Sequence, residues 1–192
     1  ALSPSGSQIW RDLATRSGRA AMNLSYPMSE ILTEASFKNA MILHAAFGGS
    51  TNLILHLPAI AHAAGLPRPT VKEWQEANQL VPRIVDALPN GPNGYATVQV
   101  FLAGGVPEAM LKIRDHLDLS VRTVSGLTLG ENLEWWEKSE RRKRCRERLY
   151  EIDGIDPDQV IRSLDHALPS TVTFPQGNLA PEGSVVKSTA ID

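Results

Sequence analysis

Cysteine is almost absent from this sequence: its 192 residues include only Cys145. An internal disulfide framework is therefore excluded, because it needs paired thiols. Cys145 also cannot supply an iron–sulfur site, since such clusters are held by several thiolates at ligand spacing. A chain with a single cysteine fits a reducing compartment, and we expect a cytoplasmic location.

An excess of charge of one sign is lacking as well. The chain carries 19 Lys and Arg against 21 Asp and Glu, for a formal net charge of −2, so no overall field attracts nucleic acid or an anionic membrane surface. No apolar run approaches the roughly 20 residues that span a bilayer, and the polar residues 1–7 do not have the pattern of a signal peptide. We therefore expect neither a nucleic-acid partner nor a membrane partner.

The five histidines lack the spacing of a metal site. No two of them lie four residues apart beside a glutamate, and neither His44 nor His56 has a Cys, Asp or Glu at metal-ligand spacing. We expect both to be packed, hydrogen-bonded core residues, although His56 could reach a ligand at the turn before its helix. The sequence predicts no catalytic residue and no metal ligand in this chain.

The most informative segment joins two helices through a glycine pair. Apolar residues at helical spacing predict a buried helix face that ends at Phe47, after which Gly48 and Gly49 can stop the helix. Ser50 lies where the N-cap of the next helix belongs. Free N–H groups at such a helix start favour a carboxylate or phosphate, although an ordinary helix–turn–helix corner is the alternative. The predicted substrate-binding residues are Ser50, Thr51 and Asn52.

Most of the remaining pattern before residue 153 is helical. Helices are expected over residues 9–24, 70–81, 97–102 and 107–116, and one long helix over 128–150, with capping boxes at Thr70 and Thr128. A strand is expected at 120–124, whereas 81–88 could be extended or a short helix. In the long helix the acids interleave with the bases, which favours a solvated face over a nucleic-acid patch. Trp135 and Trp136 must face different sides, so one can meet another domain or subunit.

The chain is predicted to divide into three parts. Residues 1–153 form the C-terminal part of a mostly helical N-terminal α/β domain, residues 154–169 a linker that contains two prolines, and residues 170–192 the start of a β-rich C-terminal domain. Alternating polar and apolar residues predict strands at 170–174 and 183–187. Hydrophobic residues, at 42% of the chain, are sufficient for a core.

Four motifs occur in order along the chain: Gly-Gly-Ser-Thr-Asn at 48–52, Ala103–Pro107, Thr123–Thr128 followed by Glu131–Leu133, and Gly177–Lys187. In this combination the chain resembles the dihydroxy-acid and sugar-acid dehydratase family. The segments 134–137, 89–93 and 170–175 are most similar to the bacterial D-xylonate dehydratase branch of that family.

The resemblance implies an internal fragment of an α/β-family enzyme, inactive alone, in which residues 170–192 begin a β-barrel-type C-terminal domain. Members of the family convert a 2,3-dihydroxy acid to a 2-keto-3-deoxy acid and water, with an iron–sulfur cluster and Mg²⁺ whose ligands are not in this chain. D-xylonate is the expected substrate; a branched-chain dihydroxy acid and 6-phosphogluconate are alternatives. The expected partners are a small sugar acid, the rest of the polypeptide and further copies in a homo-oligomer. From another class, the chain could be a helical anion-binding or scaffold module.

Overall fold

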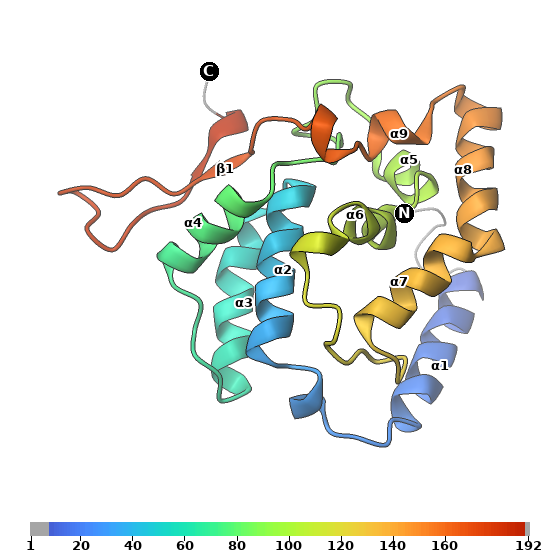
Figure 1. The fold of residues 1–192 in the computed structure, drawn as a ribbon, viewed down its shortest axis with the longest axis horizontal. Coiled ribbons are helices and arrows are strands. Elements are labelled where there is room, and N and C mark those ends of the chain that lie inside the picture. Colours follow the sequence, from blue (N-terminus) through green and yellow to red (C-terminus); the bar gives the residue numbers. More distant parts are fainter. Residues whose placement is uncertain (1–7, 191–192) are drawn as a thin grey trace.

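The computed structural model describes residues 8–190 and is mainly helical (Figure 1). Two short antiparallel strands near the C-terminal end pair Val172 with Lys187 and Thr173 with Val186. The elements are α1 Gln8–Met22, α2 Glu34–Phe47, α3 Thr51–Ala63, α4 Val71–Leu80, α5 Thr97–Leu102, α6 Gly105–Lys112, α7 Leu129–Lys138, α8 Glu140–Asp153, α9 Pro157–Val160, β1 Val172–Thr173 and β2 Val186–Lys187. Within the described range no helix combines the length and apolar character that crossing a membrane requires.

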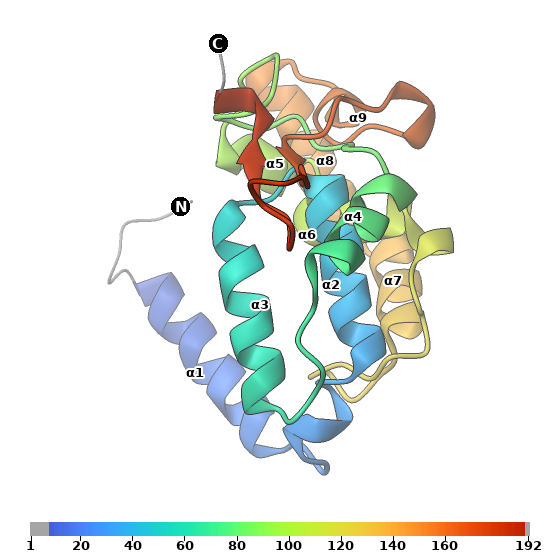
Figure 2. The same ribbon diagram turned by 90° about the vertical axis from the view of Figure 1, so that its left-hand side faces the viewer.

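Helices α2 and α3 run side by side and meet at one end through the glycine pair (Figure 2). Helix α2 begins at a reciprocal cap, in which Thr33 and Ser36 exchange hydrogen bonds, and ends at Gly48 with φ +66°. The predicted inner face of α2 is confirmed, because Phe37, Met41 and the neighbouring apolar positions are buried in the core. The corner that the sequence predicts is therefore present.

The segment over residues 81–88, for which the sequence left two possibilities, is extended. Arg83 pairs with Leu168, and Val85 pairs with Ile161, in isolated antiparallel bridges. Ile161 is fully buried against this segment, so part of the predicted linker 154–169 packs on the helical core. Nothing in this arrangement tests the predicted domain boundary, which stays a prediction.

The prediction of a single long helix over 128–150 is wrong, because the structure has two helices there, α7 and α8. They are divided at Ser139, which has extended backbone angles of φ −76° and ψ 137° and caps α8 by accepting the Arg142 N–H at 3.2 Å. The break turns α8 so that Arg142 reaches Glu108 on α6. The two tryptophans do face different sides, as predicted: Trp136 is 6% exposed, and Trp135 is 58% exposed.

Glu108 is the centre of a buried ion cluster that joins three helices. Its carboxylate has no exposed surface and accepts a hydrogen bond from the indole of Trp136. It also accepts two from the guanidinium of Arg142, one from Nε and one from Nη2. Arg146 adds a third cationic contact at 3.4 Å and also binds Asp158. Every oxygen of the buried carboxylate is thus satisfied, which is the condition under which a buried charge is tolerated.

The strand predicted at 120–124 is not formed. Arg122 makes one isolated bridge to Thr128, and the chain reverses between them at Gly126, where the Thr123 N–H donates to the Leu127 carbonyl. The β-branched run thus pairs only with the residues that directly follow it, and one bridge is too short to form a strand. The two predicted strands near the C-terminal end are each present for two residues only, and the β-barrel-type domain stays a prediction.

Candidate functional site

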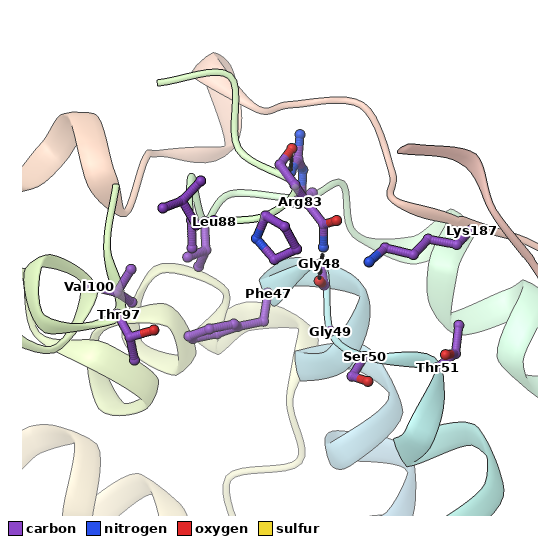
Figure 3. Close-up of a pocket in the computed structure, with 14 residues that line it drawn as sticks. Phe47, Gly48, Gly49, Ser50, Thr51, Arg83, Leu88, Thr97, Val100 and Lys187 are labelled. Carbon is purple, nitrogen blue, oxygen red and sulfur yellow. Dashed lines mark hydrogen bonds between the residues drawn. The ribbon is translucent and has the colours of Figure 1, made fainter. Parts of the chain in front are cut away.

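A cavity of about 410 Å³ opens where α2 ends and α3 begins (Figure 3). Four parts of the chain build it: the helix corner, the extended segment with the loop that follows, α5, and β2. Leu88 and Val100 give it an apolar side, to which Thr97 of α5 adds a hydroxyl group, and the glycine pair lies opposite them. We call it the corner cavity; its lining residues are Phe47, Gly48, Gly49, Ser50, Thr51, Arg83, Val85, Ala87, Leu88, Pro89, Asn90, Thr97, Val100 and Lys187.

Two of the three predicted substrate-binding residues lie in this lining. Ser50 is the N-cap of α3, as predicted, and its Oγ accepts the Asn52 N–H at 3.2 Å. Thr51 is the first residue of the helix and lines the corner cavity beside it. Asn52 is exposed and is not among the lining residues. A substrate contact for any of the three stays a prediction.

His44, on α2, fixes the position of the helix corner through a contact with the Ser50 carbonyl. Its Nε2 is 2.9 Å from the carbonyl oxygen of Ser50, and its ring packs edge-on against Trp74 at a centroid distance of 5.2 Å. A Cβ on Gly49 would collide with the His44 ring, so the absence of a side chain there permits the contact. His44 is thus the packed, hydrogen-bonded histidine that was predicted, whereas the same prediction is wrong for His56, which is exposed.

We expect His44 to make stability depend on pH. Burial lowers the pKa of His44 below its ordinary value of 6.5, and the hydrogen bond to Ser50 offsets this only in part. The unfolded chain therefore binds a proton at a higher pH than the folded chain, so stability is fully present above pH 6.5 and declines as the pH falls below it. In His44→Gln this decline should be reduced, measured as the urea midpoint at a series of pH values. The same slope in both proteins would contradict the assignment.

Arg83 and Lys187 are functional candidates that the sequence analysis missed. Arg83 is only 4% exposed; its Nη1 donates to the Asn90 carbonyl at 2.8 Å, and its Cδ lies 2.5 Å from where a Cβ on Gly48 would be. Burial lowers the pKa of Arg83, and nearby Asp86 opposes this. The only signals were a pair of charged residues, Arg83 and Asp86, in an otherwise apolar segment and the terminal lysine of the fourth family motif.

Asp86 holds the loop that forms the roof of the corner cavity. This fully buried carboxylate accepts hydrogen bonds from the Asn93 side chain at 2.8 Å and from Arg162 at 2.9 Å. A Cβ on Gly91 would collide with Asp86, so the loop can pass over the carboxylate only with glycine there. The loop and the extended segment are thereby joined, which places Asn90 beside Arg83.

Residues that could hold a metal do not gather in the described part of the chain. No group of three or more His, Cys, Asp or Glu side chains that could hold an ion occurs within residues 8–190. Cys145 is free and half-buried on α8, and the lining of the corner cavity contains no Cys, His, Asp or Glu. The residues present do not fit an iron–sulfur cluster or a magnesium ion, and what the cavity offers is positive charge, hydroxyl groups and an amide.

Comparison with known proteins identifies relatives over the full length of the chain. The family model described as "Dihydroxy-acid/6-phosphogluconate dehydratase N-terminal" matches residues 1–132. Two D-xylonate dehydratases of Escherichia coli, YagF and YjhG, are 55% and 56% identical to the chain over all of its length. Dihydroxy-acid dehydratase 1 of Methanosarcina acetivorans is 34% identical over 85% of the chain.

The matches cover a limited part of these relatives. The chain spans 31% of the length of each of the two E. coli proteins and 27% of the archaeal one. It is thus similar to about a third or less of each relative. The matches to the two E. coli proteins include the helix corner and β2.

Proposed function

Because this chain belongs to the dihydroxy-acid/6-phosphogluconate dehydratase family, we propose that it is part of a longer hydro-lyase that removes water from a 2,3-dihydroxy sugar acid, with D-xylonate as the substrate. The identity of 55–56% to two D-xylonate dehydratases, against 34% to a dihydroxy-acid dehydratase, supports D-xylonate over a branched-chain acid. The product of this reaction is a 2-keto-3-deoxy acid.

In the proposed enzyme this chain forms one wall of the substrate site at the corner cavity. The observation that carries the proposal is that Ser50 and Thr51 line a cavity at the start of a 13-residue helix, α3. Hydroxyl groups and the N–H groups of a helix start are suitable partners for the hydroxyls and carboxylate of a sugar acid. Asn52, at the second position of the helix, is proposed as a weaker contributor. The side chains of Leu88 and Val100 form an apolar side of the cavity.

The iron–sulfur cluster and Mg²⁺ expected from the resemblance would supply Lewis acidity. We propose that other residues of the longer protein hold both groups, because the described residues of this chain do not fit either of them. The proposed tasks of this chain are to bind and orient the substrate. The homo-oligomeric state and the cytoplasmic location stay predictions.

We expect Thr51→Val and Ser50→Ala in the complete enzyme to raise KM for D-xylonate. The loss of one hydrogen bond to substrate corresponds to about 1 kcal/mol, or roughly a fivefold to tenfold change per residue. Thr51→Val keeps the shape of the side chain and removes only the hydroxyl, whereas Ser50→Ala also removes the cap of α3. Steady-state kinetics of D-xylonate dehydration provide the measurement.

Two further variants serve as controls for this experiment. Asn52→Ala should have a smaller effect, because Asn52 lies outside the lining. His62→Ala, on the exposed surface of the same helix, should leave both constants unchanged. If Thr51→Val and Ser50→Ala kept the native KM and kcat, the substrate-binding role of the corner would be disproved.

A further inference from the structure

We propose that Lys187 and Arg83 form an anion subsite of the corner cavity, in which Lys187 binds the acidic group of the ligand directly and Arg83 provides a fixed positive charge behind it. The acidic group is a carboxylate or a phosphate. The inference rests on the proposed function in one respect, namely that the ligand is a sugar acid. It assigns two residues to the binding of that acid's charge.

The charge of the lining is positive throughout. Its two ionisable residues are Arg83 and Lys187, and it contains no carboxylate. The adjacent Asp86 is already bound by Arg162 and Asn93. The positive end of the α3 dipole adds to the same field, because the 13-residue helix begins at the cavity. A small anion is the ligand that this balance favours.

Arg83 provides an independent indication of an anion. A buried charge is normally paired, because removing it from water is costly. Arg83 is 4% exposed, yet no carboxylate of residues 8–190 lies within salt-bridge distance of it, and its buried Nε has no acceptor there. Among the described residues, the one hydrogen bond of its guanidinium is to the neutral carbonyl of Asn90. Asp86 is close enough to act on the charge of Arg83, but it is bound by Arg162 and makes no ion pair with Arg83. The positive charge is thus kept within the fold without a salt-bridge partner among the described residues.

Lys187 is the cation that a ligand can reach. It is half-buried on β2, where pairing with Val172 fixes its position. Figure 3 shows its side chain extending from the strand toward the glycine pair, and its ammonium group has no hydrogen bond or ion pair with any of the residues described. Because the Arg83 Nε is buried, direct contact is assigned to Lys187 and long-range attraction to Arg83.

The remaining lining is suited to the rest of such a ligand. Asn90, Thr97 and the two hydroxyl residues of the corner offer donors and acceptors for several hydroxyl groups, while Leu88 and Val100 form an apolar side. A volume of about 410 Å³ is within the usual range for small-molecule sites. A short polyhydroxylated acid, with its charged end at Lys187, satisfies both the polar and the charged groups.

The test compares Lys187→Met and Lys187→Arg in the complete enzyme. Lys187→Met keeps the length of the side chain and removes the charge, and we expect KM for D-xylonate to rise roughly 10- to 100-fold, with a smaller change in kcat. Lys187→Arg should restore most of the loss. Xylitol, which has the hydroxyls but no charge, should inhibit the native enzyme and Lys187→Met equally. The dependence of KM on salt should also be weaker in Lys187→Met.

A second comparison distinguishes the two acidic groups. D-gluconate and 6-phosphogluconate are used as competitors of D-xylonate. If Lys187 holds the carboxylate, Lys187→Met should weaken inhibition by both compounds by a similar factor. If it holds a phosphate, the loss should be confined largely to 6-phosphogluconate. Either pattern supports the anion subsite.

Other outcomes would overturn it. An unchanged KM for D-xylonate in Lys187→Met, together with unchanged inhibition by both D-gluconate and 6-phosphogluconate, would exclude a role in binding charge. A lower kcat with the native KM, and equal losses for xylitol and the acids, would exclude it as well. In those cases the native enzyme would still dehydrate D-xylonate, and the proposed function would stand. Failure of the native enzyme to dehydrate D-xylonate would instead disprove the proposed function.

Discussion

Replacing Glu108 by alanine is expected to lower the free energy of unfolding by about 3–5 kcal/mol, which is the usual cost of removing one partner from a buried ion cluster. The carboxylate receives the Arg142 guanidinium at 2.7 and 2.8 Å and the Trp136 indole at 3.0 Å. Without it, the Arg142 guanidinium and the Trp136 indole N–H would lose their acceptor at a helix junction, and Arg146 would keep only Asp158 and the Ala103 carbonyl. A cavity would also form where α6, α7 and α8 meet.

The same cluster makes the free energy of unfolding depend on pH in the acidic range. Burial raises the pKa of Glu108, but the hydrogen bonds from Arg142 and Trp136 and the charges of both arginines outweigh this, so the pKa is lower than its ordinary value of 4.5. The unfolded chain therefore takes up the proton first as the pH falls. The stability from this group is present above pH 4.5 and is lost as the pH falls toward the folded pKa. Glu108→Gln should remove this dependence.

A surface ion pair between α7 and the turn that follows α6 gives the control. Glu137 is 3.5 Å from Arg114, and both side chains are substantially exposed, so Glu137→Ala should cost less than about 1 kcal/mol. Urea denaturation monitored by circular dichroism measures the free energy of unfolding of each variant. Hydrogen exchange in α6 and α8 shows whether the loss of stability in Glu108→Ala is located at these helices. A similar small loss for Glu108→Ala would show that the cluster does not hold the three helices together.

The helix corner could be predicted from the sequence because every signal for it is local. The apolar spacing of α2, the left-handed Gly48 and the capping residue Ser50 lie within a few turns of one another. The break at Ser139 could not be found in this way. The residues on both sides of Ser139 favour a helix, and the division is fixed by the contact of Arg142 with Glu108, which is distant in sequence.

The candidate site, too, could be predicted only where its residues are close in sequence. Ser50 and Thr51 were found because they follow each other at a helix start, whereas Arg83 and Lys187 reach the corner cavity from an extended segment and a strand far along the chain. No periodicity in the sequence links these segments. The burial of Arg83 depends on its bridge to Leu168, which becomes visible only in the folded structure.

The second large effect is expected at Gly49. In Gly49→Ala the new Cβ would overlap the ring of His44, which is buried and held by Trp74 and the Ser50 carbonyl. The helix corner must shift instead, and Ser50 and Thr51 shift with it. A displacement of about 1 Å in groups that position a substrate can cost roughly 100-fold in rate. We therefore expect kcat/KM for D-xylonate in the complete enzyme to fall by about this factor.

Gly177→Ala is the matched control, because no atom lies within 4 Å of the position that its Cβ would occupy and its backbone is not left-handed. It should retain native kinetics. The circular dichroism of Gly49→Ala should stay native, since the clash is confined to one corner, which separates misplacement from unfolding. Native kcat/KM in Gly49→Ala would mean that the corner can move without consequence for the substrate. The geometry that places Ser50 and Thr51 in the corner cavity would then have no role in the reaction, whatever else the chain contributes.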